Sequence, residues 1–156
     1  MSNKNKYFFS FVLTIFFLHI LFSIFFELGK ISGNSMYPTL KDGEIEISIK
    51  SEYKEIKRGD IVNISSDIEK ESLVKRVIAF EGEVVEIKED GVYIDGKLLD
   101  EPYISKNVPS YDIGYKTTVP KGCVFVLGDN RHNSKDSREI GCIKIEEIRS
   151  ILVFHF

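Results

Sequence analysis

Tryptophan is missing from this chain of 156 residues, cysteine occurs only twice, and no run of lysine and arginine stands out. Cys123 and Cys142 have neither CxxC spacing nor the spacing of metal ligands, so the sequence predicts no metal and no cofactor. We expect both thiols to pack between strands; a disulfide is the alternative if this part of the chain faces an oxidising compartment. The net charge of −3 and the missing basic cluster predict no nucleic-acid partner.

Only the N-terminus contains a long apolar segment. The run from Tyr7 to Phe26 has 20 residues with four polar interruptions. A helix of that length spans about 30 Å, the thickness of the hydrocarbon core of a bilayer. A cleaved signal peptide is the alternative, but its apolar part is usually about 7–15 residues long and ends in small residues, which this run lacks. We therefore predict a retained transmembrane anchor over residues 7–28.

The charges that flank this anchor predict its orientation. Lys4 and Lys6 precede it, and the positive-inside rule places such residues in the cytoplasm. The predicted arrangement is a cytoplasmic N-terminus over 1–6, a single pass through the cell membrane, and an extracytoplasmic domain over 29–156. With 43% apolar and 29% charged residues the chain has an ordinary globular composition, and its length suffices for one domain with a hydrophobic core.

Behind the anchor the sequence is typical of short β-strands. Ile45, Ile47 and Ile49 alternate with polar residues and predict a half-buried strand. Further strands are expected over 61–64, 73–79, 84–87, 92–94 and 123–127, with turns at 89–91 and 95–96 and a closing strand over 148–156. Residues 100–119, which include Pro102 and Pro109, are expected to form a long loop. The predicted fold class is mostly β, a coiled antiparallel sheet with a barrel-like or sandwich form, preceded by one N-terminal transmembrane helix.

Ser35 and Lys75 form a candidate catalytic pair. Ser35 follows the anchor closely, and Lys75 lies within an apolar run. A serine hydroxyl is a weak nucleophile until a base removes its proton, and a lysine kept neutral by burial can be that base. On a strand, Lys75 shares its face with Leu73, Val77 and Ala79, so desolvation is expected to lower its pKa. The alternative is that Lys75 reaches solvent or pairs with a carboxylate.

A dense polar segment, residues 128–138, follows the strand expected over 123–127. Within it, Asp136 and Arg138 are placed to form an ion pair that fixes the loop. His132 with a neighbouring aspartate is the alternative base for Ser35, in a Ser-His-Asp triad. A histidine in a polar loop is ordinarily solvated, so we favour the pair of Ser35 and Lys75.

Three segments, taken with the anchor, resemble the sequence boxes of type I signal peptidases. They read GNSMYPTL at 33–40, VKRVI at 74–78 and GDNRHNSKDSR at 128–138, and they occur in the order typical of that family. Lysine in the second box indicates the bacterial form. The short distance between the second and third boxes resembles the compact form common in Gram-positive bacteria.

This resemblance implies a role for each matching residue. Ser35 would attack the scissile carbonyl, Lys75 would be the general base, and Ser134 would hold the lysine amine in place. The Ser35 backbone N–H would be one oxyanion donor. Some family members carry a serine at the position of Gly33 whose hydroxyl is the second donor, so the glycine of this chain leaves that donor open. The resemblance implies that four residues support the structure of the site: Asp129, Arg131, Asp136 and Arg138. It also implies that five residues line the pockets that accept small residues of the leader peptide: Ile31, Met36, Leu40, Leu73 and Val74.

The resemblance thus implies a membrane-bound serine endopeptidase that removes N-terminal signal peptides from exported preproteins. Its partners would be secretory preproteins with small residues before the cleavage site, membrane lipid and, as a further candidate, the export channel. The alternatives are another Ser-Lys protease of related β fold and an inactive, membrane-tethered binding module. The anchor and the lack of a DNA-binding segment disfavour the first. The joint presence of Ser35, Lys75 and Ser134 disfavours the second.

Overall fold

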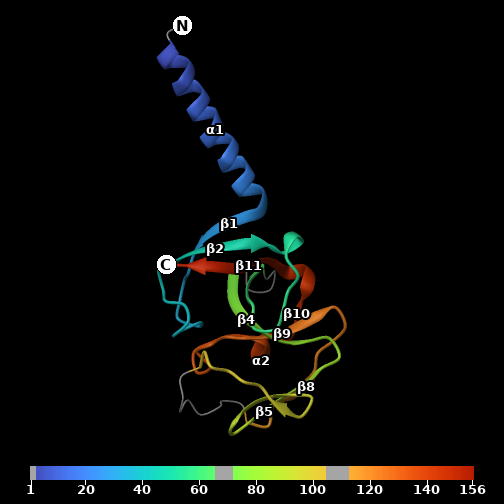
Figure 1. Ribbon diagram of the computed structural model, residues 1–156. Coiled ribbons are helices and arrows are strands. Elements are labelled where there is room, and N and C mark those ends of the chain that lie inside the picture. The colour runs from blue at the N-terminus through green and yellow to red at the C-terminus, as the bar shows by residue number, and fades with distance from the viewer. Residues whose placement is uncertain (1–2, 66–71, 105–112) are drawn as a thin grey trace.

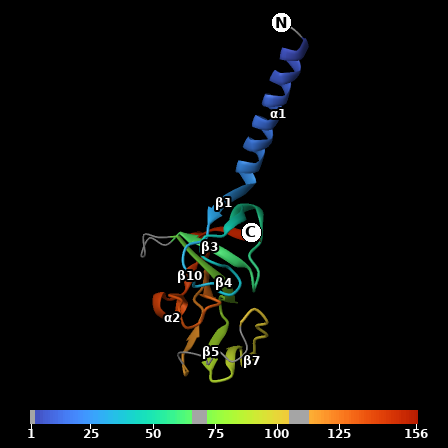
Figure 2. The ribbon, with the colours of Figure 1, turned by 90° about the vertical axis from the view of Figure 1, so that its left-hand side faces the viewer.

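The computed structural model describes residues 3–65, 72–104 and 113–156. One long helix, α1 (Asn3–Phe25), projects from a body built mostly of antiparallel strands (Figure 1; Figure 2). The mostly β fold class with one N-terminal apolar helix is therefore confirmed.

The strands form two antiparallel sheets. The larger sheet has seven strands in the order β1 (Phe26–Lys30), β2 (Ile45–Lys50), β11 (Ile148–His155), β3 (Ile61–Ser65), β4 (Ser72–Phe80), β9 (Cys123–Leu127) and β10 (Ile143–Lys144). The smaller has four, in the order β7 (Lys97–Leu98), β6 (Gly91–Ile94), β5 (Val84–Lys88) and β8 (Lys116–Thr118). The described residues also form three short helical turns: η1 (Ser51–Tyr53), α2 (Ser137–Ile140) and η2 (Ile145–Glu147).

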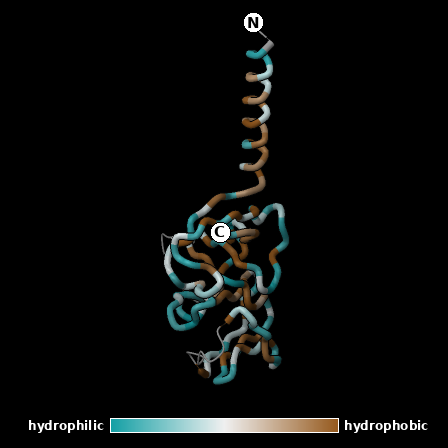
Figure 3. The backbone as a smooth tube through the Cα atoms, turned by 60° about the vertical axis from the view of Figure 1, so that its left-hand side comes forward, coloured by the Kyte–Doolittle hydropathy of each residue, from teal (hydrophilic) through white to brown (hydrophobic). Residues whose placement is uncertain are grey.

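Helix α1 is long and apolar enough to cross a membrane, and its side chains from Lys4 to Phe25 are all exposed. Figure 3 shows that apolar residues predominate along it. The helix ends at Phe25, whereas we predicted an anchor through residue 28. Residues 26–28 belong to β1, because their backbone groups pair with β2 in a register that starts at Phe26 opposite Ile49.

Strand β2 is half-buried, as its alternating pattern predicts, but its polar face is the more deeply buried one. Glu46 and Ser48 are 5% and 1% exposed, while Ile45, Ile47 and Ile49 are only partly buried. The alternation of apolar and polar residues predicts a strand, but it does not say which face of the strand is buried. Here the polar face meets buried polar side chains of β3 and β11, namely Asn63 and Ser150.

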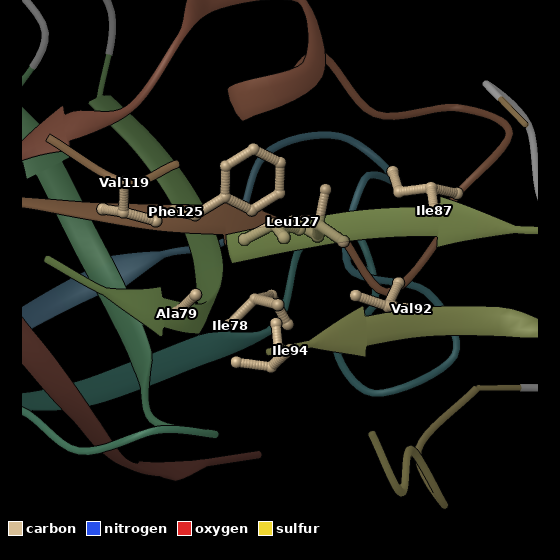
Figure 4. Close-up of a cluster of buried hydrophobic side chains, with 9 residues drawn as sticks. Ile78, Ala79, Ile87, Val92, Ile94, Val119, Phe125 and Leu127 are labelled. Atoms are coloured by element: carbon tan, nitrogen blue, oxygen red, sulfur yellow. The ribbon is translucent and has the colours of Figure 1, made fainter. Parts of the chain in front are cut away.

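Two strands of each sheet share a core that joins the sheets. Figure 4 shows Ile78 and Ala79 of β4 with Phe125 and Leu127 of β9, facing Ile87, Val92 and Ile94 of β5 and β6. Burying apolar side chains of this size is worth about 1.5–3 kcal/mol each. This core fixes β4 and β9, the two strands that hold Lys75 and the polar segment after residue 127.

The expected hairpin of the smaller sheet is present, with Val85 of β5 opposite Ile94 of β6. Its following turn uses Asp95 and Gly96, both with positive φ. The expectation of a continuous loop over 100–119 is wrong at its end, because β8 (Lys116–Thr118) pairs with β5 as a polar edge strand. The part of that loop around Pro109 lies outside the described residues.

Candidate active site

Ser35 lies in the connection between β1 and β2, and this connection is closed at its base. The backbone N–H of Ile31 donates to the Glu44 carbonyl at 2.8 Å, and the Gly43 N–H donates to the Ile31 carbonyl at 2.9 Å. Three side chains of the connection, Ile31, Met36 and Leu40, are buried in one cluster together with Ile61 of β3. These anchors on both sides hold the connection that carries Ser35 against the larger sheet.

Lys75 extends from β4 to this serine. Its Nζ lies 2.9 Å from Ser35 Oγ and donates a second hydrogen bond of 2.9 Å to the Val74 carbonyl. The lysine is 3% exposed. The two residues paired from the sequence are therefore in direct contact, although 40 positions separate them.

The surroundings of Lys75 favour its neutral form. Burial lowers its pKa to about 8, and the negative charge of Asp136 acts in the opposite direction. Taking an ammonium out of water penalises the charged state, which explains the direction. An amine with such a pKa is partly unprotonated near neutral pH, so it can accept a proton from the adjacent hydroxyl.

The segment after β9 holds the backbone of the serine. The Asn130 N–H donates to the Ser35 carbonyl at 3.0 Å, and Asn130 Nδ2 donates to the Asn34 carbonyl at 3.0 Å. At Gly128 a Cβ atom would lie 2.5 Å from the Ser35 carbonyl oxygen and would clash with the Ser134 hydroxyl. Only glycine allows so close an approach, so this position brings the third segment against the first.

Asp136 organises the same loop. Its carboxylate accepts a 3.0 Å hydrogen bond from the Gly128 N–H and forms a two-pronged ion pair with Arg138 at 2.8 and 2.9 Å. The ion pair expected from the sequence is therefore present, and it is buried on both sides. Arg131 completes the loop by donating to the Gly128 carbonyl at 3.0 Å and by pairing with Glu101.

Asp129 connects three separate segments through one buried carboxylate. Arg76 of β4 donates to both of its oxygens, at 2.8 and 2.6 Å, and Thr39 Oγ1 donates to one of them. Arg76 also donates to the Gly59 carbonyl at 2.7 Å and lies 3.8 Å from the ring centre of Tyr103. This network fixes the chain just after Ser35 relative to β4.

Ser134 lies beside Gly128 but not in contact with the lysine amine. Its Oγ is buried and has no hydrogen-bond partner among the described residues. A buried hydroxyl without a partner is costly and calls for an explanation. The role of holding the lysine amine therefore stays a prediction.

Replacing Ser134 by alanine tests that role. We expect kcat to fall about 10- to 100-fold with little change in KM, because the base loses a positioning partner while peptide binding is untouched. The loss should be smaller than for Ser35→Ala. His132→Ala is the control, because His132 is exposed and does not line the cavity beside Ser35. An unchanged kcat in folded Ser134→Ala would remove this serine from the site.

Gly33 offers no free backbone donor to a reacting carbonyl. Its N–H donates to Asp42 Oδ1 at 2.8 Å, and its φ of 86° is a conformation that favours glycine. The described structure thus leaves the second oxyanion donor open, as the sequence does. The Ser35 N–H remains the predicted first donor.

A cavity of about 710 Å³ opens beside the pair of Ser35 and Lys75. Four of the five residues predicted to form leader-peptide pockets line it: Ile31, Met36, Leu73 and Val74. Leu40, the fifth, is fully buried beneath them and does not belong to the wall. The cavity continues past these apolar side chains to a polar end around Glu46 and Asn63.

The two cysteines are free thiols, half-buried against the core that joins the sheets. Burial raises the pKa of the Cys142 thiol, and Cys123 adds to this effect. Packing thiols were the favoured expectation from the sequence. Among residues 3–65, 72–104 and 113–156, no three histidine, cysteine or acidic side chains are grouped as a metal site would require.

Several residues of the site carried no signal that a single sequence reveals. Arg76 follows Lys75 on β4 and therefore points to the opposite face, where it is 8% exposed and bound to Asp129. Tyr103 and Glu101 come from the expected loop, where nothing marks them as partners of buried arginines. The sequence offered one clue. Arg76 lies inside an apolar run, and an arginine buried there needs a partner of opposite charge.

Comparisons with known proteins identify the family of this chain. The family model described as "Signal peptidase, peptidase S26" matches residues 4–156. The chain is 44% identical to Signal peptidase I T of Bacillus subtilis (strain 168) over 84% of its length and 74% of the relative. It is 37% identical to Signal peptidase IB of Staphylococcus aureus (strain COL) over 88% of its length and 84% of the relative. A crystal structure of a signal peptidase I from Enterococcus faecalis V583 matches with a TM-score of 0.57 at 35% identity, covering 64% of this chain and 98% of that one.

Proposed function

Since this chain belongs to the signal peptidase family (peptidase S26) and cleaves signal peptides as a serine protease, we propose that Ser35 is its nucleophile and Lys75 its general base. The observation that carries the proposal is the 2.9 Å separation of the serine hydroxyl and the buried lysine amine. No other described group of the site is both basic and within hydrogen-bond distance of Ser35 Oγ.

The proposed reaction has two halves. In the first, neutral Lys75 takes the proton from Ser35 Oγ as the oxygen bonds to the scissile carbonyl carbon, and the carbonyl oxygen becomes an oxyanion near the Ser35 N–H. The oxyanion then re-forms its double bond, and the leaving amine departs with the proton held by Lys75. In the second half, Lys75 takes a proton from water, the water oxygen attacks the ester, and Ser35 recovers its proton.

We propose that the substrate lies extended along the cavity, between the segment that leads to Ser35 and the first half of β4. An extended peptide can add its backbone to a sheet edge, and alternate side chains then enter the same wall. Ile31, Met36, Leu73 and Val74 form the apolar wall beside the nucleophile. These side chains leave little space beside the nucleophile, so the wall accommodates small substrate residues before the cleavage site.

A cleavage assay with the purified full chain in detergent tests the catalytic assignment. The substrate is a preprotein that ends its signal peptide in Ala-x-Ala. We expect cleavage by the wild type and a loss of at least about 10³-fold in kcat for Ser35→Ala, because the attacking oxygen is removed. Ser32→Ala, three residues earlier on the chain, is the matched serine control. Equal activity of Ser35→Ala and the wild type would contradict the assignment, and binding without any cleavage would favour an inactive binding module.

The membrane arrangement is a separate proposal. We propose that α1 anchors the protein with Lys4 and Lys6 in the cytoplasm and the body outside, beside membrane lipid and the export channel that delivers preproteins. Protease added to intact spheroplasts is expected to digest the part after residue 30 and to leave an epitope tag at residue 1 protected. Lysed spheroplasts are the control, in which both parts are digested. Protection of the body in intact spheroplasts would overturn this orientation.

A further inference from the structure

The apolar helix α1 joins the body without a loop. It ends at Phe25, and β1 begins at Phe26, which stands opposite Ile49 of β2. Figure 1 and Figure 2 show β1 directly below the end of α1, in the part of the body nearest to the helix. Because the helix continues straight into a paired strand, its direction relative to the sheet depends on the contacts made at this joint.

Two residues of the body contact the last turn of α1. Lys50, at the end of β2, donates through Nζ to the Ser23 carbonyl at 3.0 Å. The last four carbonyls of a helix have no partner within the helix, and a lysine is favourable at this negative end. Tyr53 of η1 packs edge-on against Phe25, with the ring centres 4.8 Å apart. We call Ser23, Phe25, Lys50 and Tyr53 the anchor junction.

Strand β1 continues from the anchor junction into the wall of the active site. Glu27, its second residue, pairs with Arg149 at 3.2 Å and accepts a hydrogen bond from Ser150 at 3.1 Å, both of β11. The whole of β1 is also paired with β2. Residues 27–36 line the cavity without a break and include Ser35. The anchor junction, β1 and the nucleophile therefore form one continuous structural unit.

The end of the cavity at Glu27 is the end next to α1. A preprotein carries an apolar segment of its own before its cleavage site, and in the proposed arrangement this segment lies in the same bilayer as α1. The peptide between that segment and the scissile bond then follows β1 to Ser35. Strand β1 has five residues and is about 16 Å long at the rise of an extended chain. A substrate needs about five extended residues to cover this distance.

We propose that Lys50 and Tyr53 are positioning residues that fix the cavity relative to the end of α1. Through Ser23 and Phe25 they prevent the body from tilting about the joint, so Ser35 stays at one distance from the bilayer. This inference rests on the proposed function and on the proposed membrane arrangement. It adds a physical reason for selecting preproteins by the length of chain between their apolar segment and the cleaved bond. Cleavage of a soluble peptide, which has no segment in the bilayer, does not depend on the junction.

A length series tests the spacing with the wild-type full chain in phosphatidylethanolamine–phosphatidylglycerol liposomes. The preproteins share one apolar segment and an Ala-x-Ala ending, and they place about three or about five residues between that segment and the cleaved bond. We expect kcat/KM to be at least about tenfold higher for the longer segment, because the shorter one cannot bring the scissile bond to Ser35. Equal cleavage of both preproteins would overturn the proposal. If a soluble Ala-x-Ala peptide is cleaved no faster than by Ser35→Ala, the proposed function itself fails.

A double variant tests whether the anchor junction causes this preference. Lys50→Met removes the donor at nearly constant length, and Tyr53→Ala removes the ring. Together they are expected to reduce the preference for the longer segment to less than about twofold, because a body that tilts brings Ser35 closer to the bilayer. The kcat/KM of this variant for the soluble peptide should equal that of the wild type, which also shows that its active site is folded.

Two further proteins complete the experiment. Lys50→Arg combined with Tyr53→Phe keeps the donor and the ring, so it should show the wild-type preference. Lys54→Met is the matched control, because Lys54 is a nearby lysine that pairs with Asp60 and not with α1. The proposal is contradicted if the double variant Lys50→Met with Tyr53→Ala keeps the wild-type preference, or if it loses the preproteins and the soluble peptide equally.

Discussion

Lys75→Arg is expected to be inactive, with kcat reduced by at least about 10³-fold, although it keeps a positive charge and a similar length. A guanidinium does not lose its proton in a protein, so it cannot take the proton of Ser35. Cleavage of an Ala-x-Ala preprotein by the purified variant measures the effect. Lys121→Arg is the control for the same exchange on an exposed side chain that does not line the cavity. Substantial activity of Lys75→Arg in a preparation free of host peptidase would rule out a lysine base.

The wild-type pH profile tests the same lysine without a mutation. Because burial lowers the pKa of Lys75 to about 8, kcat/KM is expected to rise with pH and to level off above that value. An unperturbed lysine would give a rise near 10.5 instead. If kcat/KM rises only near the pKa of an unperturbed lysine, the base that activates Ser35 is not a buried amine with a lowered pKa.

The same lowered pKa affects stability in a defined direction. Between the folded pKa of about 8 and the ordinary value of 10.5, the unfolded chain binds the proton that the folded chain rejects. The contribution of Lys75 to the free energy of unfolding is therefore most favourable above the ordinary value, falls as the pH drops toward 8, and levels off below it. The charged amine costs the folded state about 3 kcal/mol at neutral pH. A buried base of this kind is a stability cost that the reaction requires.

Removing the Asp129 carboxylate is expected to have the second large effect. Asp129→Ala should lower the free energy of unfolding by about 3–5 kcal/mol, because it leaves the buried Arg76 guanidinium without its counter-ion. Activity should fall as well, since the carboxylate also holds Thr39 in the connection that carries Ser35. Urea unfolding of the full chain in detergent, followed by circular dichroism of the β-rich body, measures the change.

Two further variants test whether the loss of stability comes from the buried ion pair or from the loss of any charged side chain. Lys144→Ala breaks an exposed pair with Glu146 and is expected to cost less than about 1 kcal/mol. The double variant Arg76→Met with Asp129→Leu removes both buried charges together, so it is expected to be more stable than Asp129→Ala alone. A double variant less stable than the single one would contradict this account.

Much of the active site could be predicted from particular residues of the sequence. We paired Ser35 with Lys75 because a serine nucleophile needs a base and a lysine in an apolar run can be neutral. The structure places the two side chains in contact. The pairing of Asp136 with Arg138 depends on neighbours in the chain and is also present. Residues that act through distant partners, such as Arg76 with Asp129 and Tyr103, could not be assigned, because nothing in a single sequence says which segments meet.

The sequence by itself determined the N-terminal apolar helix, the short strands and the pairing of Ser35 with Lys75. These features follow from local physics: apolar length, alternation of side chains, and the chemistry of a few residue types. Tertiary structure alone decided where α1 ends, since pairing with β2 draws residues 26–28 into a strand. It also decided that Glu46 and Ser48 face inward, because the face of a strand that is buried depends on what the neighbouring strands place against it. Glu46 and Ser48 of β2, Asn63 of β3 and Ser150 of β11 form a hydrogen-bonded cluster for that reason, because these three strands meet only in the folded chain.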